Sequence, residues 1–277
     1  EIILIDDGST DDTPDLMAGY ADRIHYFRQG NSGPARARNH GIRVSAGEFV
    51  AFLDSDDSWL PEKIERQLKF FDGSDSEPVC CICNATMSGG PVGTRTAFEY
   101  GGLNMGTENG ILLNPLSVIA NSFILFNQVL ALRRDVFLDT GGFDEDMWLM
   151  EDYDLAVRLA ARGTWGLINT PLLIKDDSTE GIGITATRTP AKQLPVSLRI
   201  LNDVLSDHPN LPKTEQSIVA RKMRRLRRRI RAHALAESSN GLKAFGGKLA
   251  LVLLRYYSGF TRRLPGGSKP QIEPCSW

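Results

Sequence analysis

The sequence predicts an α/β fold in which helices flank a mostly parallel sheet and a basic helical extension follows. Short, β-branched apolar runs alternate with helical segments over residues 1–87. Two acidic clusters, "DDGSTDD" and "DSDD", end such runs, and parallel sheets bind ligands at the carboxyl ends of their strands. Residues 1–190 hold 29 acidic and 15 basic side chains, a net charge of −14, whereas residues 191–277 hold 5 and 17, a net charge of +12. We therefore expect a domain over 1–190 and an amphipathic, basic helical region over 191–277.

The first strand is predicted at 1–5, where the apolar run "EIILI" ends in the turn "DDGS". Thr13 followed by Pro14 is typical of a helix start and predicts a helix to about residue 22. Similar patterns predict a strand over 24–27, a helix over 34–45, a strand over 48–53, a helix over 61–71 and a strand over 78–87.

Residues 88–115 are rich in glycine and show no clear period, so we expect a long surface loop there, a candidate lid over the site. The segment "SFILFNQVLALRRDVF" predicts a strand and then the start of a helix. "GGFDEDM" reads as a turn, "EDYDLAVRLAARG" as a helix that ends at Gly163, and "TWGLINTPLLIK" as the closing strands of the body.

The basic region contains a narrow apolar stripe at helical spacing, formed by Val219, Met223, Leu226 and Ile230, and the last three lie within "RKMRRLRRRIR". A second amphipathic stretch extends to Phe260. Two interpretations stay open: the stripe packs on the body and leaves the charges in solvent, or residues 219–260 lie on an anionic membrane surface. No aromatic residues interleave with this basic segment, so no nucleic-acid partner is expected.

Three of the four cysteines lie in the apolar run "VCCIC", which is typical of a buried strand. No second cysteine pair and no nearby histidines indicate a metal site there. This cysteine usage favours a cytoplasmic location, and the basic region adds the option of a peripheral position at the inner face of the membrane. We find no signal peptide, and the longest apolar stretch is far shorter than the ~20 residues that span a bilayer. The chain opens directly in a strand, so we expect an N-terminal truncation.

Three carboxylates, Asp54, Asp56 and Asp57, follow the apolar strand at 48–53 and should repel one another. A divalent cation with oxygen ligands, Mg²⁺ or Mn²⁺, would offset that repulsion. In an extended backbone the two acids of the D-x-D point the same way, so both could face one ligand. A calcium loop is the other interpretation, but Trp59 stands where its sharp turn requires glycine.

Five ordered motifs carry a resemblance: "EIILIDDGSTDDT", "NSGPARARNHGI", "GEFVAFLDSDDSW", "GGFDEDM" and "MEDYDLAVRLAARG". In order and approximate spacing they resemble family 2 glycosyltransferases, which have the GT-A fold. The resemblance implies an inverting transfer of a sugar from a nucleotide diphosphate, with a preference for UDP, to an acceptor hydroxyl. The family begins with a strand of the type "VSVIIPxYN" and a helix, which are absent here, and the histidine that many relatives carry after the last body strand is absent as well.

The resemblance also implies residue roles. Asp7 matches the residue that reads the nucleobase, Arg38 a position close to the nucleotide, and Asp54 the ribose contact. Asp56 matches the metal ligand and Asp152 the catalytic base. The family motifs include further residues with supporting roles: Asn31, Gly33, Asp57, Trp148 and Glu151.

These roles suit the chemistry of glycosyl transfer. A metal stabilises the charge that grows on the leaving diphosphate, and a carboxylate takes the proton of the attacking hydroxyl. We expect a metal-dependent enzyme of cell-envelope or polysaccharide synthesis whose acceptor is a glycan or a lipid-linked sugar. The alternatives are a non-catalytic relative that binds nucleotide or glycan, a turn or cap role for Asp7, a surface ion pair for Arg38, and a helix N-terminal acid at Asp152.

Overall fold

The computed structural model describes residues 1–74, 76–88, 96–121, 127–176, 189–240 and 270–275. The strands of this part of the chain are β1 (Ile3–Asp6), β2 (His25–Arg28), β3 (Phe49–Ala51), β4 (Ser58–Trp59), β5 (Cys80–Ser88), β6 (Asn109–Leu112), β7 (Leu130–Arg133), β8 (Trp165–Asp176) and β9 (Ile272–Cys275). The helices are α1 (Thr13–Ala18), α2 (Pro34–Val44), α3 (Lys63–Gly73), α4 (Ala97–Tyr100), α5 (Pro115–Ile119), α6 (Arg134–Asp139), α7 (Glu151–Ala160), α8 (Pro190–Asp207) and α9 (Lys213–Asn240), with a 3-10 turn at Asn127–Val129.

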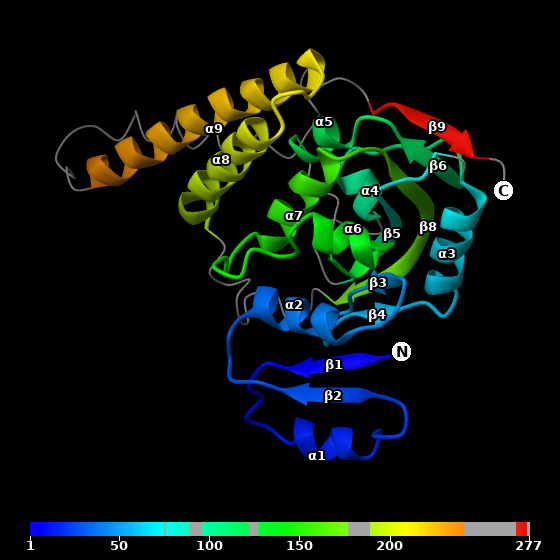
Figure 1. The fold of residues 1–277 in the computed structure, drawn as a ribbon. Helices are drawn as coiled ribbons and strands as arrows, with labels where there is room; N and C mark the ends of the chain where they lie inside the picture. Colours follow the sequence, from blue (N-terminus) through cyan, green and yellow to red (C-terminus); the bar gives the residue numbers. More distant parts are fainter. Residues whose placement is uncertain (75, 89–95, 122–126, 177–188, 241–269, 276–277) are drawn as a thin grey trace.

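Two sheets organise the described part of the chain. β1 and β2 form a parallel pair, and α2 lies between that pair and the rest of the protein (Figure 1). The larger sheet has the order β3-β7-β5-β8-β6-β9, with β4 paired to β8. Figure 1 shows α3 on one side of this sheet and α4 to α7 on the other. The fold is therefore α/β, with helices flanking the sheet, as predicted.

The prediction of a mostly parallel sheet is wrong for the larger sheet. Among the strands that the structure describes, only β5 and β8 pair in parallel within it, and the other pairings are antiparallel. β7 lies between β3 and β5 and runs against both. A short apolar run indicates a buried strand but carries no information about its direction, so the reversal could not be seen in the sequence.

The glycine-rich segment 88–115 is also not the long loop that we expected. It contains α4 and β6, and the side chains of Phe98, Leu103 and Leu112 are at most 1% exposed. β6 pairs with β8 on one edge and with β9 on the other. The prediction of a helical region over 191–277 also needs a correction, because β9, near its end, extends the sheet of the body and is not helical. Residues 89–95 of the expected lid lie outside the described part of the chain.

α8 and α9 pack against each other and cover α5 and α7 (Figure 1). Val219, Met223 and Leu226 are at most 5% exposed and belong to the same apolar core as the sheet. The stripe therefore packs on the body, and its apolar side is not available to a membrane. None of the helices in the described part of the chain is long and apolar enough to cross a membrane. The second amphipathic stretch, to Phe260, lies outside the described residues.

The core is densely packed where α3 meets the sheet. Phe70 is 1% exposed, and its ring lies against the backbone of Gly166 in β8. A Cβ at Gly166 would lie 2.5 Å from a ring atom, so only glycine permits this approach. Cys80, Cys81 and Cys83 are fully buried on β5, which confirms the interpretation of "VCCIC" as a core strand. This packing fixes β8, which pairs with β4, the strand that directly follows the carboxylates of the candidate site.

Candidate functional site

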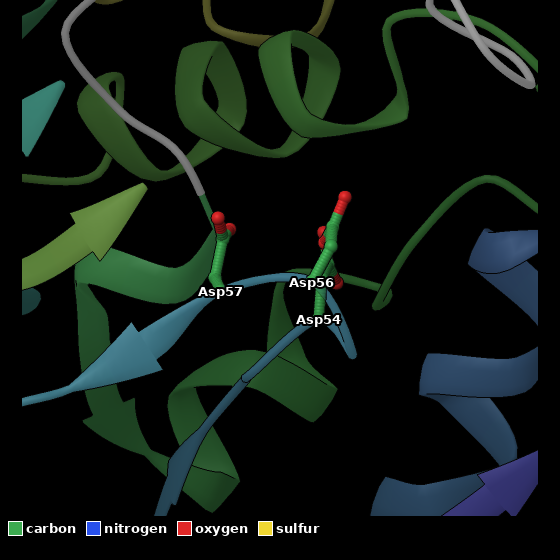
Figure 2. Close-up of side chains that lie close together, drawn as sticks. All are labelled: Asp54, Asp56 and Asp57. Carbon is green, nitrogen blue, oxygen red and sulfur yellow. The ribbon is translucent and has the colours of Figure 1, made fainter. Parts of the chain in front are cut away.

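The three carboxylates of the D-x-D segment gather on one bend of the chain between β3 and β4 (Figure 2). Their ligand atoms lie within 4.8 Å of one another. The bend is a turn closed by a hydrogen bond from the Asp57 amide to the Asp54 carbonyl, with an N–O distance of 3.2 Å. We expected an extended backbone here. The turn brings all three acids together, whereas an extended strand would align only Asp54 and Asp56.

The three acids differ in their surroundings. Asp56 is exposed, Asp54 is half-buried, and Asp57 is buried with its Oδ1 4.0 Å from the Nζ atom of Lys175. Carboxylate oxygens are the donors that Mg²⁺ and Mn²⁺ prefer. This donor set, with one acid open to solvent, fits such an ion, and Asp56 is the member with most room to reach it.

Asp54 is held from two sides. Its Oδ1 accepts a hydrogen bond of 2.8 Å from Nη2 of Arg38, and its Oδ2 accepts one from the side-chain amide of Gln128. Gln128 in turn lies in the 3-10 turn before β7, and its carbonyl accepts a hydrogen bond from the indole of Trp59. Gln128 could not be found from the sequence, because it lies 74 residues from Asp54 and belongs to none of the motifs.

Arg38 connects the acidic bend to the start of α7. Its Nη1 donates a 2.9 Å hydrogen bond to Oε1 of Glu151, while Nη2 binds Asp54. The Arg38 side chain is 15% exposed, and its guanidinium also lies over the ring of Phe143. The two carboxylates raise the pKa of Arg38 against the opposing effect of its burial. A planar guanidinium can bind two carboxylates at once, so Arg38 fixes their separation.

Asp152 follows Glu151 on the first turn of α7. It is half-buried, and its Oδ1 accepts a 2.7 Å hydrogen bond from the amide of Tyr153. Met150 caps the helix in the left-handed conformation, with a φ of 66°.

Asp152 lines a cavity of about 280 Å³ between α5, α7, α8 and α9. A second, more open hollow of about 440 Å³ at Glu108 and Asn169 contains none of the predicted site residues.

Asp7 organises a second group of predicted residues. Its Oδ1 accepts hydrogen bonds from Gln29 Nε2 and the Ser32 amide, and its Oδ2 accepts one from the Gly33 amide, each of 2.8 Å. Gly33 has a φ of 91°, and a Cβ there would lie 3.3 Å from the ring of Trp148. Trp148 therefore rests on the backbone of Gly33, with half of its surface exposed. This arrangement makes Asp7 the support of the loop that carries Asn31 and Gly33.

Asp6, the first acid of "DDGS", has a different environment from Asp7. It is 3% exposed, and it accepts hydrogen bonds from the Tyr26 hydroxyl at 2.5 Å and from the Ser9 amide at 2.7 Å. The Tyr26 bond is the main cause that lowers the pKa of Asp6 to about 2. Asp6 is therefore a structural carboxylate, whereas Asp7 remains half-exposed at the strand end.

Asn39 is a further residue that sequence reasoning missed. Its side chain donates to the Phe143 carbonyl at 2.9 Å and accepts from the Phe143 amide at 3.0 Å. These bonds tie α2 to the "GGFDEDM" turn, and Arg158 holds the same turn through the carbonyls of Thr140 and Gly142. The sequence feature that could have identified Asn39 is its position directly after Arg38 in the motif "ARN". The structure thus brings Arg38, Asp54, Asp56, Asp57 and Glu151 together, and places Asp7, Gly33 and Trp148 in a neighbouring group.

Comparisons with known proteins bear on this arrangement. Residues 1–131 match the model of the family described as glycosyl transferase family 2. An uncharacterized glycosyltransferase of Rickettsia typhi is 31% identical over 157 residues, which cover 56% of this chain and 48% of that protein. TuaG of Bacillus subtilis, named for teichuronic acid biosynthesis, is 47% identical over 74 residues, which cover 25% of this chain and 29% of that protein. The chain spans less than half the length of each of these curated relatives.

Solved structures share the fold. A crystal structure of S. aureus TarS 1–349 in complex with UDP aligns with a TM-score of 0.60 and 19% identity over 80% of this chain and 61% of that one. The mannosyltransferase PcManGT from Pyrobaculum calidifontis, in complex with GDP-Man and Mn²⁺, aligns with a TM-score of 0.60 and 17% identity over 94% and 70%. At these identities the likeness establishes the predicted GT-A fold. Together with the family match, it confirms the recognition made from the motifs: this chain is similar to glycosyl transferase family 2, whose model matches residues 1–131.

Proposed function

We propose that this chain transfers a sugar, with inversion, from a nucleotide-diphosphate donor to an acceptor hydroxyl, in the synthesis of a cell-envelope glycan. UDP-sugars are the donors that we would test first. Support for a nucleotide-sugar donor comes from TarS, which was solved with UDP and with UDP-GlcNAc. Support for an envelope glycan comes from TuaG, which is named for teichuronic acid biosynthesis.

The observation that carries the proposal is the bridge made by Arg38. One guanidinium binds Asp54 of the D-x-D bend and Glu151, the neighbour of Asp152, at 2.8 and 2.9 Å. A transferase needs a donor diphosphate and an acceptor hydroxyl at a fixed separation, because the attack is in line with the bond that breaks. Arg38 supplies a rigid link between the sequence neighbours of Asp56 and Asp152, the two groups that we assign to these tasks.

The proposed chemistry assigns one role to each group. The acceptor oxygen forms the new bond to the anomeric carbon, its proton passes to the Asp152 carboxylate, and the electron pair of the broken bond leaves on the nucleoside diphosphate. The hydrogen bond from the Tyr153 amide to Asp152 Oδ1 orients this carboxylate on α7. Asp54 would bind the ribose, and Trp148 and the loop held by Asp7 would form the wall of the nucleotide site.

A divalent cation fits the acidic bend, as the donor set indicates. Asp56, with Asp54 and Asp57 beside it, would hold Mg²⁺ or Mn²⁺, whose charge would stabilise the leaving diphosphate. PcManGT was solved with Mn²⁺. Asp57 is buried near Lys175, so in a metal site it would add negative charge to the bend without being open to solvent itself.

The test is a sugar-transfer assay on Asp152→Asn, with Asp72→Asn as the control. Asp72 is an exposed acid near the end of α3 and belongs to none of the site groups. Loss of a general base lowers turnover about 10²–10⁴-fold, and we expect this loss in Asp152→Asn with donor affinity nearly unchanged. The measurement is UDP release from a panel of UDP-sugars, together with the dissociation constant of UDP.

Two outcomes would contradict the assignment. Turnover of Asp152→Asn equal to that of Asp72→Asn would remove Asp152 as the base. Metal-dependent UDP binding with no release from any donor, on an acceptor panel that includes phosphate-bearing sugars, would favour the non-catalytic alternative.

A further inference from the structure

The cavity beside Asp152 has positively charged walls. α7 contributes Asp152, whereas α9 contributes Lys222 and Arg229 to the same cavity. α8 adds the polar side chains of Gln193 and Ser197. The volume of about 280 Å³ is close to the lower end of the ~300–1,000 Å³ range of small-molecule sites. The cavity is thus formed jointly by the start of the candidate base helix and by the basic helix.

The cations of this cavity lie close together. Burial, and then the neighbouring charges of Arg229 and Arg225, lower the pKa of Lys222 to about 8. Lys222 makes no ion pair with a carboxylate of the residues that the structure describes. Lys222 is half-buried beside other cations, a position in which a bound anion would stabilise its charge.

The other basic residues of α9 contrast with this group. Arg224, Arg227, Arg228 and Arg231 are exposed and face solvent. The apolar side of the helix, at Val219 and Met223, is buried in the core, so the helix cannot rotate these exposed charges toward the cavity. Lys222 and Arg229 are therefore held at the cavity by the packing of α9.

From this geometry we propose that Lys222 and Arg229 form an anion subsite for the acceptor, which selects a sugar carrying a phosphate or a carboxylate near the hydroxyl that Asp152 activates. The inference rests on the proposed function, because it assigns the acceptor of the same site. It gives the basic helix a part in substrate selection, since a negatively charged acceptor would bind between α8 and α9 and present its hydroxyl to α7.

The test measures binding of glucose 6-phosphate, glucuronate and glucose to the full chain by calorimetric titration, with EDTA present so that no metal-dependent site contributes. We expect the wild-type protein to bind at least one of the two anionic sugars about tenfold or more tightly than glucose. A hydrogen bond to a charged group contributes a difference in affinity of this size. Lys222→Gln and Arg229→Gln should each lose this preference. Lys222→Arg should keep it, and so should the control Arg228→Gln, which removes an exposed charge from the same helix. The two anionic arms separate a phosphate from a carboxylate specificity.

Equal binding of all three sugars to the wild type, or an undiminished preference in Lys222→Gln, would overturn the proposal. So would a preference that disappears in Asp56→Ala, or with saturating UDP when Mn²⁺ replaces EDTA, because the anion would then occupy the donor site. UDP titration with Mn²⁺ on the wild type and on Lys222→Gln reports separately on the proposed function. Failure of UDP binding with an intact anion preference would contradict the donor site alone, and the reverse result would contradict the anion subsite alone.

Discussion

Arg38 is the residue on which the geometry of the candidate site depends most. The resemblance placed it close to the nucleotide, and one alternative was an ordinary surface ion pair. The structure shows a guanidinium that is 15% exposed and binds two carboxylates from segments far apart in the chain. Glu151 is 5% exposed, so removal of Arg38 would leave a buried charge without its partner.

Arg38→Met is therefore expected to destabilise the protein by about 3 kcal/mol, the usual cost of removing one partner from a buried ion pair. The measurement is the free energy of unfolding from urea denaturation. Arg36→Met is the matched control on the same helix, because its ion pairs with Glu145 and Asp146 are largely exposed, and it should cost less than about 1 kcal/mol. Equal costs for the two variants would contradict the bridging role of Arg38.

The sequence identified the acids of the site but not the side chains that hold them. Asp54, Asp56 and Asp57 stand out because three carboxylates in four positions are unusual after a buried strand. Gln128 does not stand out, and Asn39 is marked only by its place after Arg38 in "ARN", since each acts on a segment more than 70 residues away. A partner at such a separation is decided by the packing of the whole fold, and a single sequence has no local signal for it.

At the scale of elements, the loop between β2 and α2 depends on one glycine. Gly33 has a φ of 91° and ψ of 162°, a conformation that L side chains rarely adopt, and it supports the ring of Trp148. Its amide also binds Asp7. The loop thus joins β1, α2 and the turn before α7, and these elements surround the proposed nucleotide site.

Gly33→Ala should destabilise the protein by roughly 1–3 kcal/mol, the cost of holding a non-glycine residue in this conformation. It should also displace Trp148, which we would follow as a change of tryptophan fluorescence on the folded variant. Gly30→Ala is the control in the same loop, because a Cβ at Gly30 would contact nothing within 4 Å, and it should change the stability by less than about 1 kcal/mol. A Gly33→Ala variant as stable as Gly30→Ala would show that the loop does not require this conformation.

Most elements of the first 87 residues could be predicted to within a few residues at their ends. Those of 88–115 could not. The apolar residues of α4 and β6 lie between glycines and polar residues, so they give neither a helical nor a strand period. β4 has two residues and β9 four, and both depend on a neighbouring strand for their formation. The direction of each strand could not be predicted for the same reason, because the tertiary fold decides which strands pair.

At the scale of the whole molecule, the charge division of the sequence does not correspond to two separate bodies. α8 and α9 share one core with the sheet, and β9 extends the sheet itself. The division into domains at residue 190 stays a prediction, and the described parts of the basic region pack on the body. An anionic membrane partner stays a prediction, and among the described residues it would rely on the exposed arginines of α9.

Val219→Asp tests whether α9 belongs to the body. Val219 is fully buried, and a carboxylate in that position should cost at least about 3 kcal/mol in the free energy of unfolding. Arg228→Asp, an exposed change on the same helix, should stay within about 0.5 kcal/mol of the wild type. Urea denaturation followed by far-UV circular dichroism measures both. If Val219→Asp unfolded at the wild-type urea concentration, the packing of α9 on the core would be contradicted.

The central claim, a metal-dependent nucleotide site at the D-x-D bend, is tested most directly by calorimetric titration of UDP with and without Mn²⁺. The titration would use the wild type, Asp56→Ala and the control Asp72→Asn. We predict binding that needs Mn²⁺, is lost in Asp56→Ala, and is unchanged in Asp72→Asn, because Asp56 is the solvent-open acid of the cluster. UDP binding that is indifferent to Mn²⁺ and to Asp56→Ala, or no UDP binding to the wild type, would contradict the claim.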